Sequence, residues 1–402
     1  MIYFDNNATT PIAPEVFEAM LPVLTSIYGN PSSTHDAGCR ARKIVENSRQ
    51  QVASLLGARL VEEIIFTSCG TESDNWAILG TLETNPDKRH IVTTRVEHEA
   101  VRNLCEKLER GGYEITWLEV DEQGFLDLDA LKNALRADTA IVSVMLANNE
   151  TGILFPVTEI ARIVKENSGA IMHCDGVNAV GKVPVDLKNT EIDLFSLSGH
   201  KFHAPKGIGA LYVRNGVELP SFFTGGGQES GMRAGTEAVH QIASLGKAAE
   251  LAAAFLSVPP AVAGGSNYEF NPPATAGGTD IVRALRNKLE GGILQTIPNA
   301  SLNGTRDRAI RLPNTSSISF ENTNGEAILA KLNDLGVCVS TGSACNSDNH
   351  TASAVLQAMN IPYSKAMGAI RFSLGRYNTE DEVDFVLEKL PKIIQETLQL
   401  SN

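Results

Sequence analysis

Short runs of β-branched and aromatic residues alternate with longer amphipathic stretches between residues 60 and 215. Such runs, bounded by glycine or polar residues, are typical of buried strands. They predict seven strands, at Ile64–Thr67, His90–Thr94, Glu114–Leu118, Ala140–Met145, Ala170–Cys174, Asp193–Leu197 and Gly209–Val213. The amphipathic stretches predict helices at Ser73–Leu82, Ala100–Arg110, Leu128–Arg136 and Val157–Asn167. This alternation predicts an α/β fold, in which helices cover both faces of a mainly parallel sheet.

The pattern changes after residue 256. Residues 257–280 are rich in Pro, Gly and Ala, and this composition predicts an irregular insertion. The periodicity then returns and predicts the helix Asp280–Gly291, the strand Ser316–Phe320, the helix Gly325–Leu335 and a final helix Glu380–Leu398. A chain of 402 residues is long enough for two domains. We expect a large domain over residues 15–256 and a smaller α/β domain formed by residues 1–14 and 257–402.

Composition and charge narrow the possible partners. Apolar residues make up 43% of the chain and charged residues 20%, which is ordinary for a soluble globular protein. The net charge of −13, with no long basic run, argues against a nucleic-acid partner. No apolar run approaches the roughly 18 residues of a membrane span, and Met1–Asn7 does not resemble a signal peptide. We therefore expect a cytoplasmic protein with no membrane partner.

Six cysteines are scattered along the chain, at Cys39, Cys69, Cys105, Cys174, Cys338 and Cys345. No Cys-x-x-Cys pair occurs, so neither a zinc ribbon nor a thioredoxin-type site is favoured, and no metal site is predicted. In a reducing compartment these residues are free thiols. Only Cys345, at the end of the small and polar stretch Ser340–Cys345, has a setting typical of a reactive thiol.

A lysine and an aspartate lie at the ends of two neighbouring predicted strands. Lys201 ends the stretch Ser196–Lys201, and Asp175 ends the stretch Met172–Asp175. Such a lysine can form a Schiff base with pyridoxal 5′-phosphate (PLP), while the carboxylate keeps the pyridine nitrogen protonated. Taken singly, each residue is more often a solvated lysine, an ordinary cap or an ion-pair partner. The interpretation therefore depends on other clusters that point to the same chemistry.

Further polar residues follow other predicted strands. Gly70 and Thr71 open a helix and are candidates for holding a phosphate at its N-terminus, with a plain cap as the alternative. His98 is a candidate for stacking on a planar ring and for proton transfer, with a structural role as the alternative. Asn149 either donates to a cofactor or caps a turn. Arg371, in an apolar run, fits a substrate carboxylate or, equally, a structural ion pair.

Taken together, the polar motifs resemble those of the NifS/IscS-type cysteine desulfurases, which are PLP enzymes of the class-V aminotransferase family. The motifs occur in order over nearly the whole chain except roughly residues 257–280. They are Asp5–Thr10, Gly29–Ser33, Thr71–Asn75, Glu97–His98, Ala147–Gly152, Ser198–Lys201, Ser343–Cys345 and Arg371–Arg376. The resemblance implies the fold of the fold-type I PLP-dependent transferases. It also implies a homodimer with active sites near the subunit interface.

The resemblance implies a reaction and a role for each matching residue. L-cysteine becomes L-alanine, and its sulfur passes to Cys345 as a persulfide that supplies iron–sulfur cluster assembly through an acceptor or scaffold protein. Lys201 forms the Schiff base and removes the Cα proton, and His98 stacks on the ring and transfers protons. Asn149 and Arg371 bind the substrate carboxylate. The residues implied to bind the cofactor are Gly70, Thr71, His98, Asn149, Asp175, Asn178, Ser198, His200, Lys201 and, from the other subunit, Thr236.

The chain departs from the family pattern at four places. Asn178 stands where relatives usually have glutamine, and Ser230 stands where many have arginine. Residues 346–353 lack the usual Leu-Glu-Pro, and residues 257–280 are an addition. Two alternatives remain open. One is another PLP enzyme of this fold, such as a selenocysteine or cystine lyase or an aminotransferase, and the other is a low-activity scaffold homologue.

Overall fold

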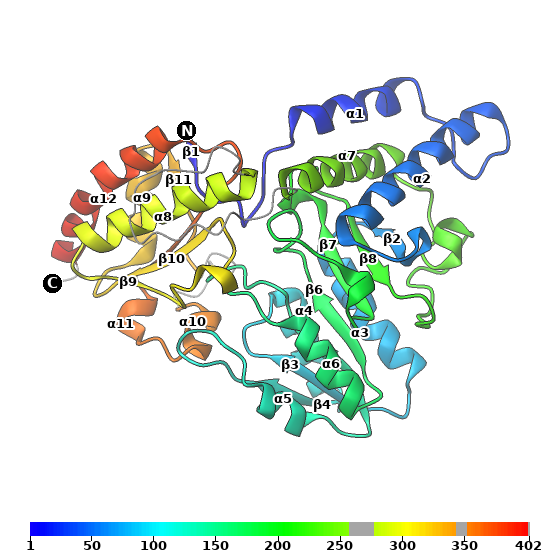
Figure 1. Ribbon diagram of the computed structural model, residues 1–402, viewed down its shortest axis with the longest axis horizontal. Coiled ribbons are helices and arrows are strands. Elements are labelled where there is room, and N and C mark those ends of the chain that lie inside the picture. The colour runs from blue at the N-terminus through cyan, green and yellow to red at the C-terminus, as the bar shows by residue number, and fades with distance from the viewer. Residues whose placement is uncertain (257–276, 343–351, 401–402) are drawn as a thin grey trace.

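Seven strands form one mixed sheet in the order β2-β8-β7-β6-β5-β3-β4 in the computed structural model, which describes residues 1–256, 277–342 and 352–400 (Figure 1). Strand β8 runs antiparallel to both of its neighbours, and the other neighbouring pairs are parallel. This sheet confirms the predicted α/β fold class. The strands are β2 (Ile64–Thr67), β3 (His90–Thr94), β4 (Glu114–Leu118), β5 (Thr139–Ser143), β6 (Ile171–Asp175), β7 (Leu194–Ser198) and β8 (Gly209–Val213).

Helices cover both faces of this sheet because successive side chains of a strand point to opposite sides. Along β2, Ile64 and Phe66 pack in one hydrophobic cluster, whereas Ile65 packs against Trp76 on the opposite face. Burying each such side chain contributes roughly 1.5–3 kcal/mol. The helices of this part are α1 (Pro14–Thr25), α2 (Asp36–Leu56), α3 (Gly70–Thr84), α4 (Glu99–Arg110), α5 (Leu128–Ala134), α6 (Val157–Asn167) and α7 (Val239–Leu256).

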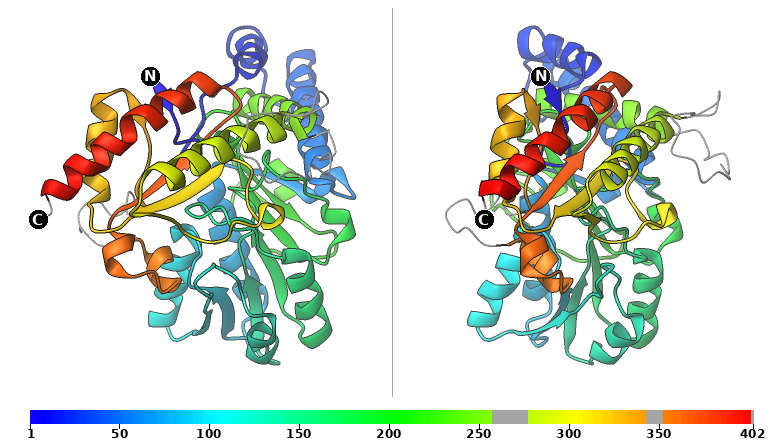
Figure 2. Two further views of the ribbon diagram at one scale, coloured as in Figure 1. Left: turned by 60° about the vertical axis from the view of Figure 1, so that its left-hand side comes forward. Right: turned by 90° about the vertical axis from the view of Figure 1, so that its left-hand side faces the viewer.

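A second sheet is antiparallel, with the strand order β12-β10-β9, and lies apart from the large sheet (Figures 1 and 2). Side chains of β10 and β12 belong to a second hydrophobic cluster. Phe4 belongs to this cluster, and β1 (Ile2–Tyr3) pairs with β11 (Val337–Cys338), so the N-terminus lies against the C-terminal part of the chain. The division into two domains stays a prediction. The remaining elements are α8 (Gly278–Thr296), β9 (Ala300–Leu302), β10 (Thr315–Phe320), α9 (Gly325–Asp334), α10 (Ala354–Ala358), α11 (Tyr363–Ala366), β12 (Ala369–Ser373) and α12 (Glu380–Leu400).

Helix α8 differs from its prediction at both ends. It begins at Gly278, so the last residues of the expected irregular stretch are helical, while residues 257–276 lie outside the described part. It also continues beyond Gly291 to Thr296. A Cβ at Gly292 would lie 2.6 Å from a methyl group of Leu387, so this glycine lets α12 pack closely on α8. That packing outweighs the roughly 1 kcal/mol that a glycine costs within a helix.

Smaller differences concern α5 and β5. The predicted helix over residues 128–136 ends at Ala134, and the predicted strand over residues 140–145 is β5, which ends at Ser143. Side-chain patterns locate such boundaries only to within a few residues. None of the helices in the described part is long and apolar enough to cross a membrane.

Candidate active site

The carboxyl ends of β2, β3, β5, β6 and β7 meet at one edge of the large sheet, where a cavity of about 160 Å³ opens. Open α/β sheets bind their ligands at this edge. Nine of the predicted site residues line the cavity: Gly70, Thr71, His98, Asn149, Asp175, Asn178, Ser198, His200 and Lys201. Residues that lie more than a hundred positions apart in the sequence are thus brought together at one site.

The remaining three predicted residues lie elsewhere. Arg371 lines an adjoining cavity of about 390 Å³, which shares His98, Asn149 and Lys201 with the first. Thr236 is exposed and is not among the residues that line either cavity. Cys345 lies outside the described residues.

Lys201 and Asp175 come from the ends of two adjacent parallel strands, β7 and β6. The Lys201 Nζ donates hydrogen bonds to two main-chain oxygens of the N-terminal segment, Asn7 O at 2.6 Å and Ala8 O at 3.0 Å. Asp175 is buried, and its Oδ1 accepts a hydrogen bond from the main-chain nitrogen of Val177 at 2.8 Å. The fold therefore holds an amine and a carboxylate in one cavity, as the sequence predicts.

A second carboxyl group, Asp74 of α3, lies in the same cavity wall and escaped the sequence analysis. Burial raises the pKa of Asp74 to about 7, although a hydrogen bond from Ser196 opposes this rise. Burial, with the charge of Asp74 in addition, raises the pKa of Asp175 to about 6. Both carboxyls are costly to ionise where they lie, so this side of the cavity favours a cation.

His173 of β6 contacts Asp74 and two hydroxyl groups on the neighbouring strands β5 and β7. Its Nε2 lies 3.0 Å from Ser196 Oγ and 3.5 Å from Asp74 Oδ1, and its Nδ1 lies 2.8 Å from Ser143 Oγ. Burial lowers the pKa of His173 to about 4, so the ring is neutral near pH 7. A neutral imidazole fixes the positions of its hydroxyl neighbours without neutralising a carboxylate.

Other residues of the cavity lining suit an anion. Helix α3 begins at Gly70 without a side-chain cap, so the main-chain N–H groups of its first turn have no side-chain partner from the preceding Cys69. A Cβ at Gly70 would lie 2.5 Å from a methyl group of Val177, so glycine keeps this wall open. Ser198 Oγ is buried and has no hydrogen-bond partner within the described part of the chain. These groups can all donate to a phosphate.

Two histidines border the cavity in their neutral forms. His98 caps α4, because its Nδ1 accepts a hydrogen bond from the main-chain nitrogen of Ala100 at 3.1 Å, which leaves the ring proton on Nε2. Burial lowers the pKa of His98, although the charge of Asp175 opposes this. Burial, with the charge of Lys201 in addition, lowers the pKa of His200 to about 4. His98 therefore has a structural role as the cap of α4, and it also lines both cavities.

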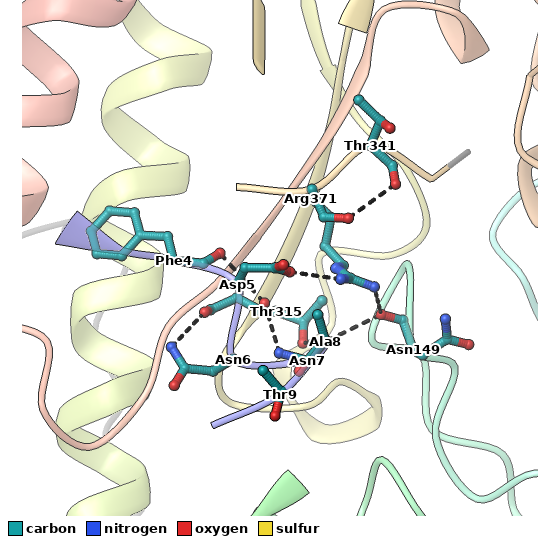
Figure 3. A network of polar contacts seen from close by, with 12 residues as sticks. Phe4, Asp5, Asn6, Asn7, Ala8, Thr9, Asn149, Thr315, Thr341 and Arg371 are labelled. Carbon is teal, nitrogen blue, oxygen red and sulfur yellow. Dashed lines mark hydrogen bonds and ion pairs between the residues drawn. The ribbon is translucent and has the colours of Figure 1, made fainter. Parts of the chain in front are cut away.

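Arg371 combines the two roles that the sequence left open. Its Nη2 lies 2.8 Å from Asp5 Oδ1, and its Nη1 donates to the main-chain oxygen of Asn149 at 3.0 Å (Figure 3). The side-chain amide of Asn149 points away from the guanidinium (Figure 3). The structural ion pair therefore exists, and the same guanidinium lines the cavity beside Lys201. The Nε of Arg371 has no hydrogen-bond partner among the residues that the structure describes.

The glycine-rich loop before α7 is fastened by Glu229 rather than by its glycines. Both carboxylate oxygens of Glu229 accept hydrogen bonds from Arg49, and one also accepts from the main-chain nitrogen of Phe66. Glu229 and Ser230 both have positive φ, at 47° and 56°, which non-glycine residues rarely adopt. The ion pair to Arg49 outweighs this local strain and determines the path of the loop toward Thr236.

Comparison with known proteins identifies the family. The sequence model for class-V aminotransferases matches residues 2–257 and 278–386. The chain belongs to the class-V aminotransferase family. Among its curated relatives, cysteine desulfurase 2 of Trichormus variabilis is 51% identical, with 100% of this chain and 95% of the relative covered. The cysteine desulfurase NifS of Azotobacter vinelandii is 48% identical, with 100% and 94% covered.

Solved structures agree with this family. One described as a NifS-like protein superposes with a TM-score of 0.87 and 38% identity, covering 98% of this chain and 99% of that chain. A NifS-like protein from Rickettsia africae superposes with a TM-score of 0.82 and 30% identity over 98% and 99% of the two chains. The resemblance and the fold-type I architecture are confirmed.

Class-V aminotransferases are PLP enzymes, and the residues of the cavity fit this cofactor. The unpartnered Ser198 Oγ and the space beside Gly70 suit a phosphate. In the same cavity, the buried Asp175 suits a protonated pyridine nitrogen, and Lys201 supplies the amine. The donor set that this class-V aminotransferase presents therefore matches the cofactor of its family.

Proposed function

We propose that this chain binds PLP and is a cysteine desulfurase, which converts L-cysteine to L-alanine and carries the removed sulfur as a persulfide on Cys345. The observation that supports this most is the placement of Lys201 and Asp175 in one cavity with an uncapped helix N-terminus. Amine, carboxylate and anion site are the three groups that PLP requires of a protein. The curated relatives named cysteine desulfurase, at about half identity over the whole chain, support the choice of substrate.

The residues of the cavity divide the work of binding and proton transfer. When bound, PLP supplies an electron sink that stabilises negative charge at the substrate Cα. Asp175 keeps the pyridine nitrogen protonated, Lys201 Nζ takes the Cα proton, and the neutral His98 also transfers protons. The carbonyls of Asn7 and Ala8, which accept hydrogen bonds from the Lys201 amine, can hold this amine in position once substrate has displaced it from the cofactor. Arg371, already oriented by Asp5, binds the substrate carboxylate through its fork of N–H groups.

Sulfur transfer requires a thiolate. Cys345 attacks the sulfur of the bound cysteine, a sulfur–sulfur bond forms, and the carbon–sulfur bond breaks. The electron pair of the broken bond stays on the substrate Cβ, which takes up a proton and becomes the methyl group of alanine. Gly342 and Ala352, on either side of the segment that carries Cys345, both line the cavity with Lys201 and Arg371. That placement of the flanking residues supports Cys345 as the acceptor.

The enzyme acts as a cytoplasmic homodimer that passes its sulfur to an acceptor or scaffold protein for iron–sulfur cluster assembly. The exposed apolar side chains of α1, at Phe17, Leu21 and Leu24, support a subunit interface. The exposed position of Thr236, away from the cavity of its own chain, is consistent with a role at the partner's cofactor.

Mass spectrometry of Cys345 after brief incubation with L-cysteine tests this proposal. The expected result is one additional sulfur atom on Cys345 together with released alanine. Cys345→Ala should abolish both, because no other thiol is expected to accept the sulfur. Cys39→Ala, which removes an exposed thiol outside the cavity, is the matched control and should leave both unchanged.

Two results would contradict the proposal. Alanine release that survives Cys345→Ala would favour a lyase that acts directly on its substrate, such as a selenocysteine or cystine lyase. Purified protein without a visible PLP absorption band, even after addition of PLP, would favour a scaffold homologue.

A further inference from the structure

A second lysine, Lys182, hydrogen-bonds to a residue of the cavity lining and has no role in the chemistry above. Its Nζ donates to three oxygens: Asn178 Oδ1 at 2.8 Å, Asn178 O at 2.9 Å and Asn7 Oδ1 at 3.2 Å. Three acceptors match the three hydrogens of a protonated amine. Burial, with the charges of Lys201 and Arg371 in addition, lowers the pKa of Lys182 well below its usual range. Burial disfavours the charged form of this amine, yet all three of its hydrogens have acceptors. We therefore expect Lys182 to have a specific role beside the cavity.

Its main partner, Asn178, is a residue of the cavity lining with an incomplete set of hydrogen bonds. Asn178 is only 5% exposed, and its Nδ2 has no partner within the described ranges 1–256, 277–342 and 352–400. A lysine has donors and no acceptor, so the amide atom that faces Lys182 must be Oδ1. The unpartnered Nδ2 is therefore the group that Asn178 offers to a molecule in the cavity beside Asp175.

Asn7 connects this pair to the Schiff-base lysine. The side-chain oxygen of Asn7 accepts from Lys182, and its main-chain oxygen accepts from Lys201 Nζ. Asn7 is fixed in turn, because its Nδ2 donates to Thr315 Oγ1 at 2.8 Å and to Asn149 O at 3.1 Å (Figure 3). Lys182 is thus held between a rigid N-terminal segment and the amide that it orients.

We propose that Lys182 is a positioning residue that fixes the side chain of Asn178 as a hydrogen-bond donor to an anionic oxygen of bound PLP. This inference rests on the proposed binding of PLP. Asn178 is one methylene shorter than the glutamine usual in the family, and the lysine four residues later anchors the short amide in one orientation. The oxygen that best fits is the phenolic oxygen of the ring, because that oxygen is negative and lies on the same ring as the nitrogen that Asp175 pairs with.

A pH titration of the visible absorption band of the bound cofactor tests the inference without measuring turnover. The midpoint of this titration is the pH at which half of the Schiff base is protonated. A donor to the phenolic oxygen stabilises its negative charge most in the unprotonated form. Loss of the donor therefore raises the midpoint pH. We expect Lys182→Met and Asn178→Ala each to raise the midpoint by about one pH unit, a tenfold change in proton affinity. In the Asn178→Ala background, Lys182→Met should move the midpoint by less than half as much.

Lys188→Met, the same substitution at an exposed lysine, is the control and should leave the midpoint unchanged. Asn178→Asp is a second variant in case Lys182→Met does not fold, because it keeps an oxygen facing Lys182 and removes the amide donor. It should raise the midpoint at least as much as Asn178→Ala. An unchanged midpoint pH in Asn178→Asp would overturn the inference. It would also be overturned if Lys182→Met shifted the midpoint as much in the Asn178→Ala background as it does alone. A wild-type protein with no band at all refutes PLP binding itself.

Discussion

Asp74 offers the sharpest test of the electrostatics in the cavity. The side chain is 1% exposed, and its pKa of about 7 means that the folded protein holds a proton that the unfolded chain releases near pH 3.8. Stability from this group is therefore fully present below about pH 4 and is lost as the pH rises through 7. Asp74→Asn keeps the shape of the side chain and removes the charge, so it should abolish this loss.

The size of the effect follows from the shift. A pKa that rises from 3.8 to about 7 corresponds to on the order of 4 kcal/mol of unfolding free energy at pH 8. Between pH 5 and 7 the wild-type protein should lose about 1.4 kcal/mol per pH unit from this group. The variant should therefore match wild type below about pH 4, exceed it by about 2 kcal/mol at pH 5, and exceed it by about 4 kcal/mol at pH 8. The limit of about 4 kcal/mol is an upper bound, because an asparagine can form only some of the hydrogen bonds that the protonated carboxyl forms with Ser196.

Urea unfolding of the cofactor-free protein at pH 5, 6, 7 and 8 measures this difference. Fluorescence of Trp76, which is buried on the same helix as Asp74, reports the unfolding of this part of the fold. All samples need one protein concentration, because association would shift the apparent stability. Asp87→Asn, at an exposed aspartate, is the control and should show no pH-dependent gain. A difference between Asp74→Asn and wild type that stays constant from pH 5 to 8 would refute the reasoning.

Three further substitutions test the groups that hold the site in place. Asp5→Asn removes the charged partner of Arg371 and should raise the KM for L-cysteine roughly 10-fold to 100-fold, with a smaller change in kcat. An unchanged KM in steady-state kinetics would contradict the role of Asp5 in orienting Arg371. Gly70→Ala places a methyl group against Val177 and should weaken PLP affinity about 10-fold to 100-fold, as measured by equilibrium dialysis. Unaltered affinity would mean that the N-terminus of α3 does not contact the cofactor. Glu229→Ala leaves the largely buried guanidinium of Arg49 without its ion-pair partner. It should lower the free energy of unfolding in urea by about 2–3 kcal/mol. A loss below about 0.5 kcal/mol would contradict the role of Glu229 in holding its loop.

The pattern of the sequence predicted the large sheet because most of its strands are buried on both faces. Runs such as Ile64–Thr67 are short, apolar and β-branched, which is typical of buried strands. The strands β1, β9 and β11 were not predicted, since two or three residues carry no periodicity. They exist because distant segments pair with them, as Ile2 does with Val337. Tertiary pairing of this kind leaves no local signal.

The candidate site shows the same limit at the level of single residues. Residues that follow a strand, such as Asp175 and His98, were found because the ends of parallel strands meet at one edge of a sheet. Asp74 and Lys182 were missed, because an acidic residue in the first turn of a helix and a lysine after a glycine are typical of solvated positions. The four-residue spacing between Asn178 and Lys182 was the one available signal, and it gains meaning only when both side chains are known to be buried.

The charges around the cavity show why the cofactor-free protein carries these costs. Burial raises the pKa of Asp74 and of Asp175, and the charge of Asp74 raises that of Asp175 further, while burial and the charges of Lys201 and Arg371 lower the pKa of Lys182. Burial therefore disfavours the charged forms of Asp74, Asp175 and Lys182, and a neighbour of the same sign adds to this effect at Asp175 and Lys182. A molecule with a cationic ring nitrogen and anionic oxygens compensates both kinds of charge at once, since it supplies the opposite charge to each. The buried charged groups therefore lower the stability of the protein without PLP and favour the binding of PLP, whose ring carries both a positive and a negative charge.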